Sequence, residues 1–207
     1  MDRNDARDLP PDLELPLATG APWWYWLGGR PSLDFVNTLR ERWNRRVECL
    51  VSADDLALWL TQATLLKQPM PVKKGVLEGA RALREAIDDA VTSVLAGAPV
   101  AQDSVTVIDD WLVFAGARPT LVSAGGELLL AERGPADSPK RALGMVALDA
   151  ARMLGVAEER RRIRICASNT CSARFYDRSP AAARRWCSMR ACGNVAKARR
   201  HRARATA

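Results

Sequence analysis

The sequence predicts a mainly α protein with a small β-sheet or hairpin, an α+β fold in which a helical N-terminal domain precedes a small C-terminal four-cysteine module. Three observations support this prediction. Apolar residues recur at helical spacing in several segments of the first three-quarters of the chain. The period changes once, where two short apolar runs flank a glycine pair. Four of the five cysteines fall in two matched pairs within the last fifth of the chain.

Composition divides the chain into three parts. Residues 1–21 contain three prolines and no periodic pattern, which is typical of a flexible N-terminal segment. Residues 22–159 contain the periodic segments and form the predicted helical domain, and residues 160–207 form a separate basic module. A chain of 207 residues is long enough for one medium domain with a small appendage.

The helical domain opens with an aromatic run. Residues 23–26 read Trp-Trp-Tyr-Trp and are followed by Gly28 and Gly29, so we expect an extended segment and a turn. Pro31 favours a helix start, and the apolar residues that follow it at helical spacing predict a helix over residues 32–44.

Three further helices are predicted next. Ser52 is a suitable N-cap for a helix that ends near Lys67, because two aspartates follow it in the first turn. A sustained apolar face predicts a longer helix over residues 73–95, which Gly97 ends. A shorter apolar stripe predicts a helix over residues 102–115.

A β-hairpin and a last long helix complete the domain. Thr120–Ser123 and Glu127–Ala131 are apolar runs separated by an Ala-Gly-Gly turn, which is a hairpin pattern. The segment 23–26 is a candidate third strand for this sheet. Helical spacing returns after Pro139 and predicts a helix that closes near Gly155.

Charge is distributed unevenly along the chain. Residues 1–159 contain 17 Lys/Arg and 23 Asp/Glu, whereas residues 160–207 contain 14 Lys/Arg and a single acid, Asp177. Such a basic segment usually contacts a polyanion or a membrane surface, and a solubilising tail is the simpler alternative. No stretch approaches the roughly 20 apolar residues of a membrane span, and the acidic N-terminus has no signal-peptide pattern. We therefore expect a cytoplasmic protein with no membrane contact.

The paired cysteines have the spacing Cys166-x4-Cys171-x15-Cys187-x4-Cys192. Two short-spaced pairs joined by a loop of this length are typical of a tetrahedral zinc site with four thiolate ligands. Neighbouring arginines favour the thiolate form that binds zinc. Four sulfur ligands leave no position open for water, so this zinc site would stabilise the fold of the module rather than catalyse a reaction.

Three alternatives for these cysteines are less favoured. Disulfides are rare in a reducing compartment. A redox pair usually has the spacing Cys-x-x-Cys, and iron–sulfur clusters have other spacings. The fifth cysteine, Cys49, lies among apolar residues and is interpreted as a small buried hydrophobe.

The sequence contains none of the common catalytic motifs. It has no P-loop, dinucleotide fingerprint, nucleophile elbow or HExxH motif, and its single histidine, His201, lies in the basic tail. Carboxylate chemistry stays open, but nothing favours any particular pair. We therefore expect a protein that is not an enzyme.

Cations surround the paired cysteines and continue beyond them. The Ala- and Arg-rich residues after Cys192 predict a helix whose charge suits a phosphate backbone better than a core. Phe175, Tyr176 and Trp186 are few for an RNA-stacking platform, and we expect them to pack around the metal. The predicted nucleic-acid contacts are Arg174, Arg178, Arg184, Arg185, Arg190, Lys197, Arg199, Arg200, Arg202 and Arg204.

Several motifs carry a resemblance to known families. WCSM at 186–189, CGN at 192–194 and KARR at 197–200, with the upstream cysteine pair, resemble the CGNR-type zinc finger, and Val195 stands where that family has arginine. GGRPSLDFVNTLRER at 28–42 resembles the start of the ABATE domain, which accompanies this finger in bacterial stress-induced transcription regulators. The resemblance implies that the chain is a regulator and that its zinc ligands are Cys166, Cys171, Cys187 and Cys192.

Two functional hypotheses follow from the sequence. In the first, a transcription regulator binds DNA through the basic zinc module, and its helical domain senses a ligand or a partner. In the second, the module binds an acidic protein or the acidic domain of its own chain, without DNA. A small-molecule effector and a homo-oligomer are compatible with both hypotheses.

Three polar residues near the aromatic run are candidates for a ligand pocket. They are Asn37, Thr38 and Arg40, which interrupt an otherwise apolar segment. The alternative is that Asn37 and Thr38 bond local backbone groups and that Arg40 forms a surface ion pair.

Overall fold

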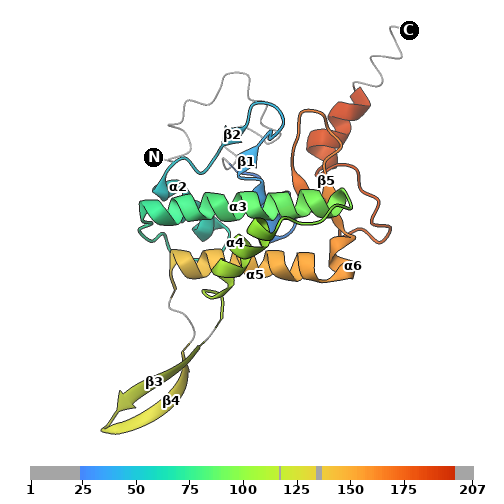
Figure 1. The fold of residues 1–207 in the computed structure, drawn as a ribbon. Coiled ribbons are helices and arrows are strands. Elements are labelled where there is room, and N and C mark those ends of the chain that lie inside the picture. Colours follow the sequence, from blue (N-terminus) through green and yellow to red (C-terminus); the bar gives the residue numbers. More distant parts are fainter. Residues whose placement is uncertain (1–23, 117, 134–136, 199–207) are drawn as a thin grey trace, which may run out of the picture. The chain divides into compact units, whose positions relative to one another are not determined.

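The computed structural model describes residues 24–116, 118–133 and 137–198 (Figure 1). The chain forms two compact units. We call the unit of Leu50–Arg161 the helical unit, and the unit that combines the chain up to Cys49 with the chain from Arg162 onwards the terminal unit. None of the described helices combines the length and apolar composition that a membrane span needs.

The helical unit confirms the predicted succession of helices and hairpin. The first helix begins with a capping box, in which Ser52 Oγ accepts a hydrogen bond from the Asp55 N–H (3.2 Å) and the Asp55 carboxylate accepts one from the Ser52 N–H (2.7 Å). The elements are α2 (Ala53–Gln62), α3 (Lys74–Leu95), α4 (Gln102–Leu112), β3 (Arg118–Ala124), β4 (Glu127–Arg133), α5 (Pro139–Gly155) and α6 (Ala157–Arg160).

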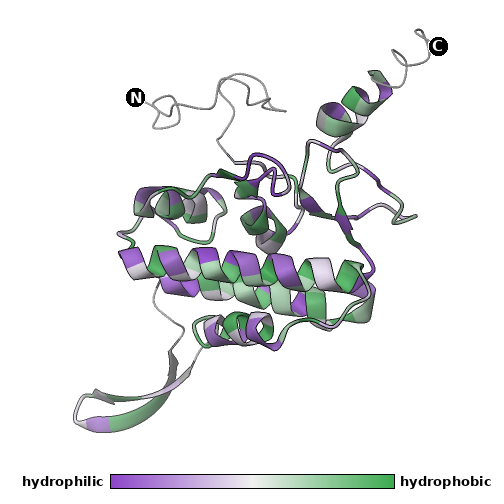
Figure 2. Cartoon of the chain, turned by 45° about the horizontal axis from the view of Figure 1, so that its top comes forward, coloured by the Kyte–Doolittle hydropathy of each residue, from purple (hydrophilic) through white to green (hydrophobic). Residues whose placement is uncertain are grey.

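Helices α3, α4 and α5 pack against one another around the core of the helical unit. Figure 2 shows hydrophobic and hydrophilic residues alternating around α3, and Leu83, Ile87 and Val91 on its apolar face are fully buried. A Cβ atom on Gly144 of α5 would lie 2.8 Å from the backbone nitrogen of Ala115. Only glycine therefore lets α5 approach the end of α4 this closely.

Strands β3 and β4 form the predicted hairpin, which extends away from the helices of its unit (Figure 1). Leu121 pairs with Leu130, and both side chains are exposed. The expectation that residues 23–26 join this sheet is wrong, because β3 and β4 pair only with each other among the described strands. Trp24 and Tyr25 are instead buried in the terminal unit.

The terminal unit contains short elements from both ends of the chain. Strands β1 and β2 pair antiparallel, β5 and β6 pair antiparallel, and α1 packs against β6. Residues 194–198 are helical, and the rest of the predicted basic helix lies outside the described residues. The elements are α1 (Pro31–Val36), β1 (Leu39–Arg40), β2 (Val47–Glu48), β5 (Ile163–Ile165), β6 (Arg174–Tyr176) and the π-helical turn η1 (Met189–Gly193).

The helix predicted over residues 32–44 is wrong in length, since α1 ends at Val36. Thr38 Oγ1 donates a hydrogen bond to the Phe35 carbonyl at 2.6 Å, so a side-chain hydroxyl bonds this backbone carbonyl at the end of the helix. Glu41 and Arg46 then adopt positive φ angles of 47° and 52° between β1 and β2. The chain therefore leaves the helical path although the apolar spacing continues.

Candidate metal centre

The four paired cysteines converge in the terminal unit. Their Sγ atoms all lie within 4.8 Å of one another. The Sγ–Sγ distance is 3.8 Å between Cys171 and Cys187 and 3.7 Å between Cys187 and Cys192. A disulfide bond is only about 2.05 Å long, so these sulfur atoms are neighbours without being bonded.

The sulfur distances fit a single zinc ion. Four thiolates around zinc at about 2.3 Å lie roughly 3.8 Å apart in a tetrahedron. Cys166, Cys187 and Cys192 are buried, so the sulfur atoms face one another rather than solvent. A set of four sulfur ligands completes the tetrahedron, and the zinc that fits here has a structural role.

The β5–β6 hairpin positions the first pair of cysteines. Cys166 follows β5 directly, and its N–H donates a hydrogen bond to the Ala173 carbonyl at 2.9 Å, which extends the strand pairing into the turn. The Ala173 N–H in turn points at Cys171 Sγ at 3.5 Å. A backbone donor aimed at sulfur stabilises the thiolate that a metal needs.

The π-helical turn η1 positions the second pair. The Ser188 carbonyl accepts hydrogen bonds from the N–H groups of Cys192 and Gly193, both at 3.0 Å. A Cβ atom on Gly193 would lie 2.7 Å from the Met189 sulfur. The glycine of the CGN motif thus leaves room for the end of the Met189 side chain to lie against the turn.

A small hydrophobic core surrounds the sulfur cluster. Phe175 is fully buried in it, and Trp186 and Leu27 pack against it. The expectation that the aromatic residues of the module pack around the metal is confirmed for Phe175 and Trp186. Cys49 lies outside the sulfur cluster and is fully buried, as predicted for a small hydrophobe.

Because the four sulfur atoms lie close together, the pKa values of some of these thiols are lowered and those of others are raised. Hydrogen bonds with Cys171 lower the pKa of Cys166, and hydrogen bonds with Cys166 raise the pKa of Cys187. Thiolates at this spacing repel one another, so the last thiols ionise with difficulty. A divalent cation neutralises that repulsion, and metal binding is accordingly favoured as pH rises.

Residues 28–37, which lie far from the cysteines in the sequence, complete the module. The Asn37 side chain donates a hydrogen bond to the Arg174 carbonyl (2.9 Å) and accepts one from the Arg174 N–H (2.8 Å). This pair of bonds resembles the pair that a residue of an adjacent antiparallel strand forms through its backbone. The Tyr176 N–H donates to the Gly28 carbonyl at 2.7 Å. Segments that lie far apart in the sequence therefore satisfy the backbone of β6 together.

The polar residues predicted to line a ligand pocket are held within the terminal unit. Asn37 forms hydrogen bonds with the backbone of β6, which is distant in the sequence. Thr38 donates a hydrogen bond to the nearby Phe35 carbonyl, so the alternative of a local backbone bond is confirmed for Thr38. The prediction that Arg40 forms a surface ion pair is wrong, because Arg40 is buried. Its guanidinium carbon lies 3.8 Å from the centroid of the Tyr25 ring. Burial lowers the pKa of Arg40, and the nearby Cys49 and Cys171 oppose that effect.

The structure separates the predicted nucleic-acid contacts into three groups. The first group is Arg174, for which the predicted contact with nucleic acid is corrected because the side chain is buried. Its guanidinium donates a hydrogen bond to the Ser172 carbonyl and lies 5.4 Å from the Trp43 ring centroid. Exposed cations are Arg178, Arg184, Arg185, Arg190 and Lys197. Arg199, Arg200, Arg202 and Arg204 lie outside the described residues.

Asp177, the only acid of the basic segment, is a structural residue that sequence reasoning did not single out. Its carboxylate is fully buried and accepts hydrogen bonds from the backbone N–H groups of Ser179 (2.9 Å) and Arg184 (2.7 Å). Burial by itself raises the pKa of Asp177, but these hydrogen bonds and the charge of Arg184 outweigh it and lower the pKa. The sequence signal that could have identified Asp177 is that it is the single acidic residue in a basic segment.

We expect Asp177→Asn to destabilise the protein at pH 7 by about 1–3 kcal/mol, because a buried backbone N–H loses its acceptor. The lowered pKa means that the carboxylate contributes its full stability above the unfolded pKa of about 3.9 and loses it as pH falls through the folded value. Urea unfolding of the zinc-loaded chain at pH 7 measures the change. Asp110→Asn, at an exposed carboxylate, is the control, and equal effects of the two substitutions would contradict this role.

The fold and the site together define a zinc-finger protein in which the helical unit is inserted, in the sequence, between the two parts of the terminal unit. Two family models match: ABATE, described as "Putative stress-induced transcription regulator", over residues 29–156, and the CGNR zinc finger over residues 162–205. The chain belongs to the ABATE family and carries a CGNR zinc finger, which is a zinc-binding module. Both are regulator and zinc-finger types rather than enzyme types. No curated protein matches the chain.

Proposed function

We propose that the chain is a DNA-binding transcription regulator. Cys166, Cys171, Cys187 and Cys192 bind one zinc ion, the cations around them contact the DNA backbone, and the helical domain senses a ligand or a partner. The observation that carries this proposal is the set of exposed arginines and lysine on a module whose sulfur atoms have the spacing of a zinc site. The ABATE description supports the regulatory role.

Two of these arginines are held in place by the aromatic core of the module. The guanidinium of Arg184 lies 5.0 Å from the Phe175 ring centroid and donates a hydrogen bond to the Cys187 carbonyl at 2.8 Å. The guanidinium of Arg185 lies 5.4 Å from the Trp186 ring centroid. Cations that are ordered before binding lose less entropy when they meet phosphates, so zinc would support the binding surface as well as the fold.

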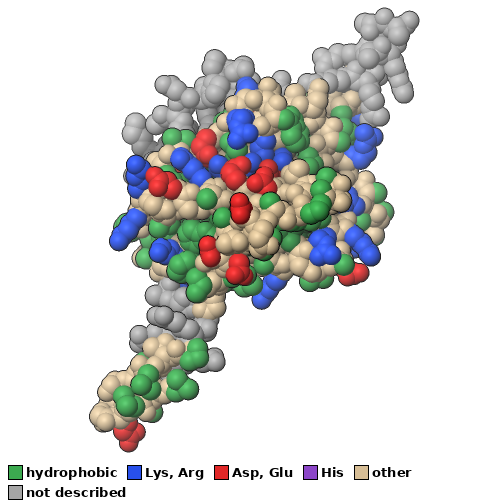
Figure 3. Space-filling view, viewed as in Figure 1, with side chains coloured by type: hydrophobic (Ala, Val, Ile, Leu, Met, Phe, Trp, Pro, Cys, Tyr) green, Lys and Arg blue, Asp and Glu red, His purple; other side chains and the backbone are tan. Residues whose placement is uncertain are grey.

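The surface of the helical unit is less suited to a polyanion. Figure 3 shows acidic side chains among the basic ones over α3 and α4. Phosphate groups are repelled by exposed carboxylates, whereas the described part of the module after Arg162 contains a single acid, which is buried. The charge distribution therefore favours the terminal unit as the DNA-contacting part.

We expect the zinc-loaded full chain to bind a short random-sequence DNA duplex with strong salt dependence. Arg185→Gln/Arg190→Gln/Lys197→Gln should flatten the slope of log Kobs against log[salt] by roughly 2.7, because each lost phosphate contact contributes about 0.9. Fluorescence anisotropy between roughly 50 and 200 mM salt measures the slope. A chelator should abolish binding, since it removes the ion that orders the module.

Lys67→Gln/Lys73→Gln/Lys74→Gln is the matched control, because it removes the same charge from exposed positions of the helical unit. This control should leave the salt slope unchanged. Equal slopes for the two triple variants would contradict a specific contact by the module. No DNA binding by the wild type would support the second hypothesis, in which the module binds an acidic protein.

A further inference from the structure

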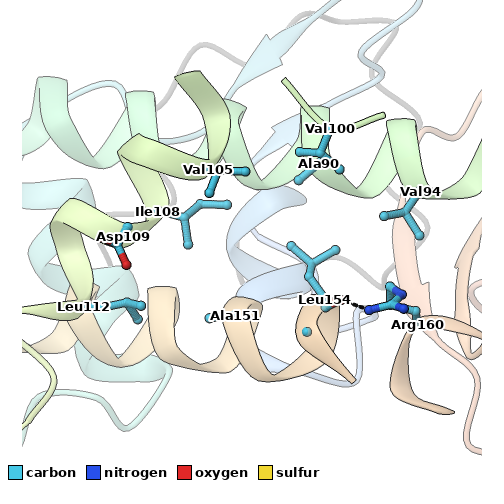
Figure 4. Close-up of a pocket in the computed structure, with 11 residues that line it drawn as sticks. Ala90, Val94, Val100, Val105, Ile108, Asp109, Leu112, Ala151, Leu154 and Arg160 are labelled. Atoms are coloured by element: carbon cyan, nitrogen blue, oxygen red, sulfur yellow. Dashed lines mark hydrogen bonds between the residues drawn. The ribbon is translucent and has the colours of Figure 1, made fainter. Parts of the chain in front are cut away.

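A cavity of about 410 Å³ lies among α3, α4, α5 and α6 in the helical unit. Figure 4 shows that its side chains come from these helices and from the α3–α4 connection. Its walls are apolar, with Val94, Ile108, Leu112 and Leu154 among them. The hollow opens to solvent, and concave apolar surfaces of this kind are typical of binding sites.

Small residues on two of the long helices leave the space open. Ala90 on α3 and Ala151 and Gly155 on α5 line the cavity, and larger side chains at these positions would fill it. Val105 of α4 is 44% exposed at the same site, although it belongs to the apolar lining. The volume falls within the roughly 300–1,000 Å³ that is usual for small-molecule pockets.

Two charged residues lie at opposite ends of the apolar lining (Figure 4). Arg160 Nη1 donates a hydrogen bond to the Leu154 carbonyl at 2.6 Å, which holds the guanidinium at one end. Asp109 lies at the other end. Among the described residues, neither of them forms an ion pair, so the guanidinium keeps donors for an added acceptor.

We propose that this cavity binds a small apolar monocarboxylic acid. Its carboxylate pairs with Arg160, and its hydrocarbon part lies among Ile108, Leu112 and Leu154. The carboxylate of Asp109 at the far end disfavours a second negative charge, which selects a monoacid over a diacid. The inference rests on the part of the proposed function that assigns sensing to the helical domain, and it does not depend on DNA binding.

Decanoate, kept below its micelle-forming concentration, is the probe, and decanol is its uncharged counterpart. Isothermal titration calorimetry with the zinc-loaded full chain should show saturable decanoate binding that is roughly 10- to 100-fold tighter than decanol binding, because of the charge-assisted hydrogen bond. Arg160→Gln should reduce the affinity for decanoate to the level of the affinity for decanol, and it should leave the affinity for decanol unchanged. Arg152→Gln, at an exposed arginine of α5 outside the cavity, should bind both probes as the wild type does.

Ala151→Phe should abolish binding of both probes, since it fills the cavity from α5. Val105→Trp fills it from the open side at a half-exposed position, and it keeps the test decisive if the first substitution disturbs α5. Absence of saturable decanoate binding, equal affinities for decanoate and decanol, or wild-type binding by Arg160→Gln would each overturn the proposal. A failure of DNA binding leaves these results untouched, because no DNA is present.

Discussion

Cys187→Ser is expected to release the zinc ion and unfold the terminal unit, while the helical unit keeps its helices. Cys187 Sγ lies 3.8 Å from the sulfur of Cys171 and 3.7 Å from that of Cys192, so its loss removes one of the four ligands of the tetrahedron. Structural zinc binding contributes about 10–16 kcal/mol in isolated zinc fingers. Whole domains are stable by only about 5–15 kcal/mol, so the module is not expected to survive the loss.

Elemental analysis of the purified full chain should find one zinc per wild-type chain and none in the variant. Amide hydrogen exchange should show lost protection at β5 and β6 and retained protection in α3 and α5. Cys49→Ala is the matched control, because Cys49 is a buried cysteine outside the sulfur cluster and should retain the zinc. A Cys187→Ser protein that keeps one zinc and wild-type protection would exclude the four-sulfur site.

Asn37→Ala is expected to destabilise the terminal unit by about 2–6 kcal/mol. The Asn37 amide is buried and bonds both the N–H and the carbonyl of Arg174, at 2.8 and 2.9 Å. Alanine leaves both backbone groups without these partners, and an unsatisfied buried group costs about 1–3 kcal/mol. Because β6 follows the turn that carries Cys171, we also expect the variant to release zinc to a chelator faster.

Urea unfolding and the rate of zinc transfer to a chromogenic chelator measure these two effects. Asn44→Ala is the control, since Asn44 lies in the exposed turn between β1 and β2. Unchanged stability together with an unchanged transfer rate in Asn37→Ala would show that the contact between Asn37 and Arg174 does not support the zinc module.

The sequence predicted the helical unit well because its signals are local. The capping box at Ser52 and the apolar stripe of α3 each depend on residues a few positions apart. The same reasoning failed for residues 32–44, where Leu33, Val36 and Leu39 are all buried but the chain changes direction. Apolar spacing reports which residues are buried, and turn geometry decides whether the path between them is helical.

The candidate site was predictable in part for the same reason. Cysteine spacing is a local property, since each pair comes from one turn, and it pointed to Cys166, Cys171, Cys187 and Cys192. The contact between Asn37 and Arg174 joins residues 137 positions apart and has no counterpart in any local pattern. Burial of Arg174 was equally hidden, because an arginine looks like a surface cation until its neighbours are known.

The sequence by itself determined the helical composition, the four clustered cysteines and the basic charge around them, because periodicity, short-range spacing and composition are properties of neighbouring residues. Only the tertiary structure decided that residues 28–37 complete the zinc module, which cations remain exposed, and that the helices leave a cavity with Arg160 at one end. Those features arise from packing between distant segments, and packing depends on shapes and distances that the order of residues does not display.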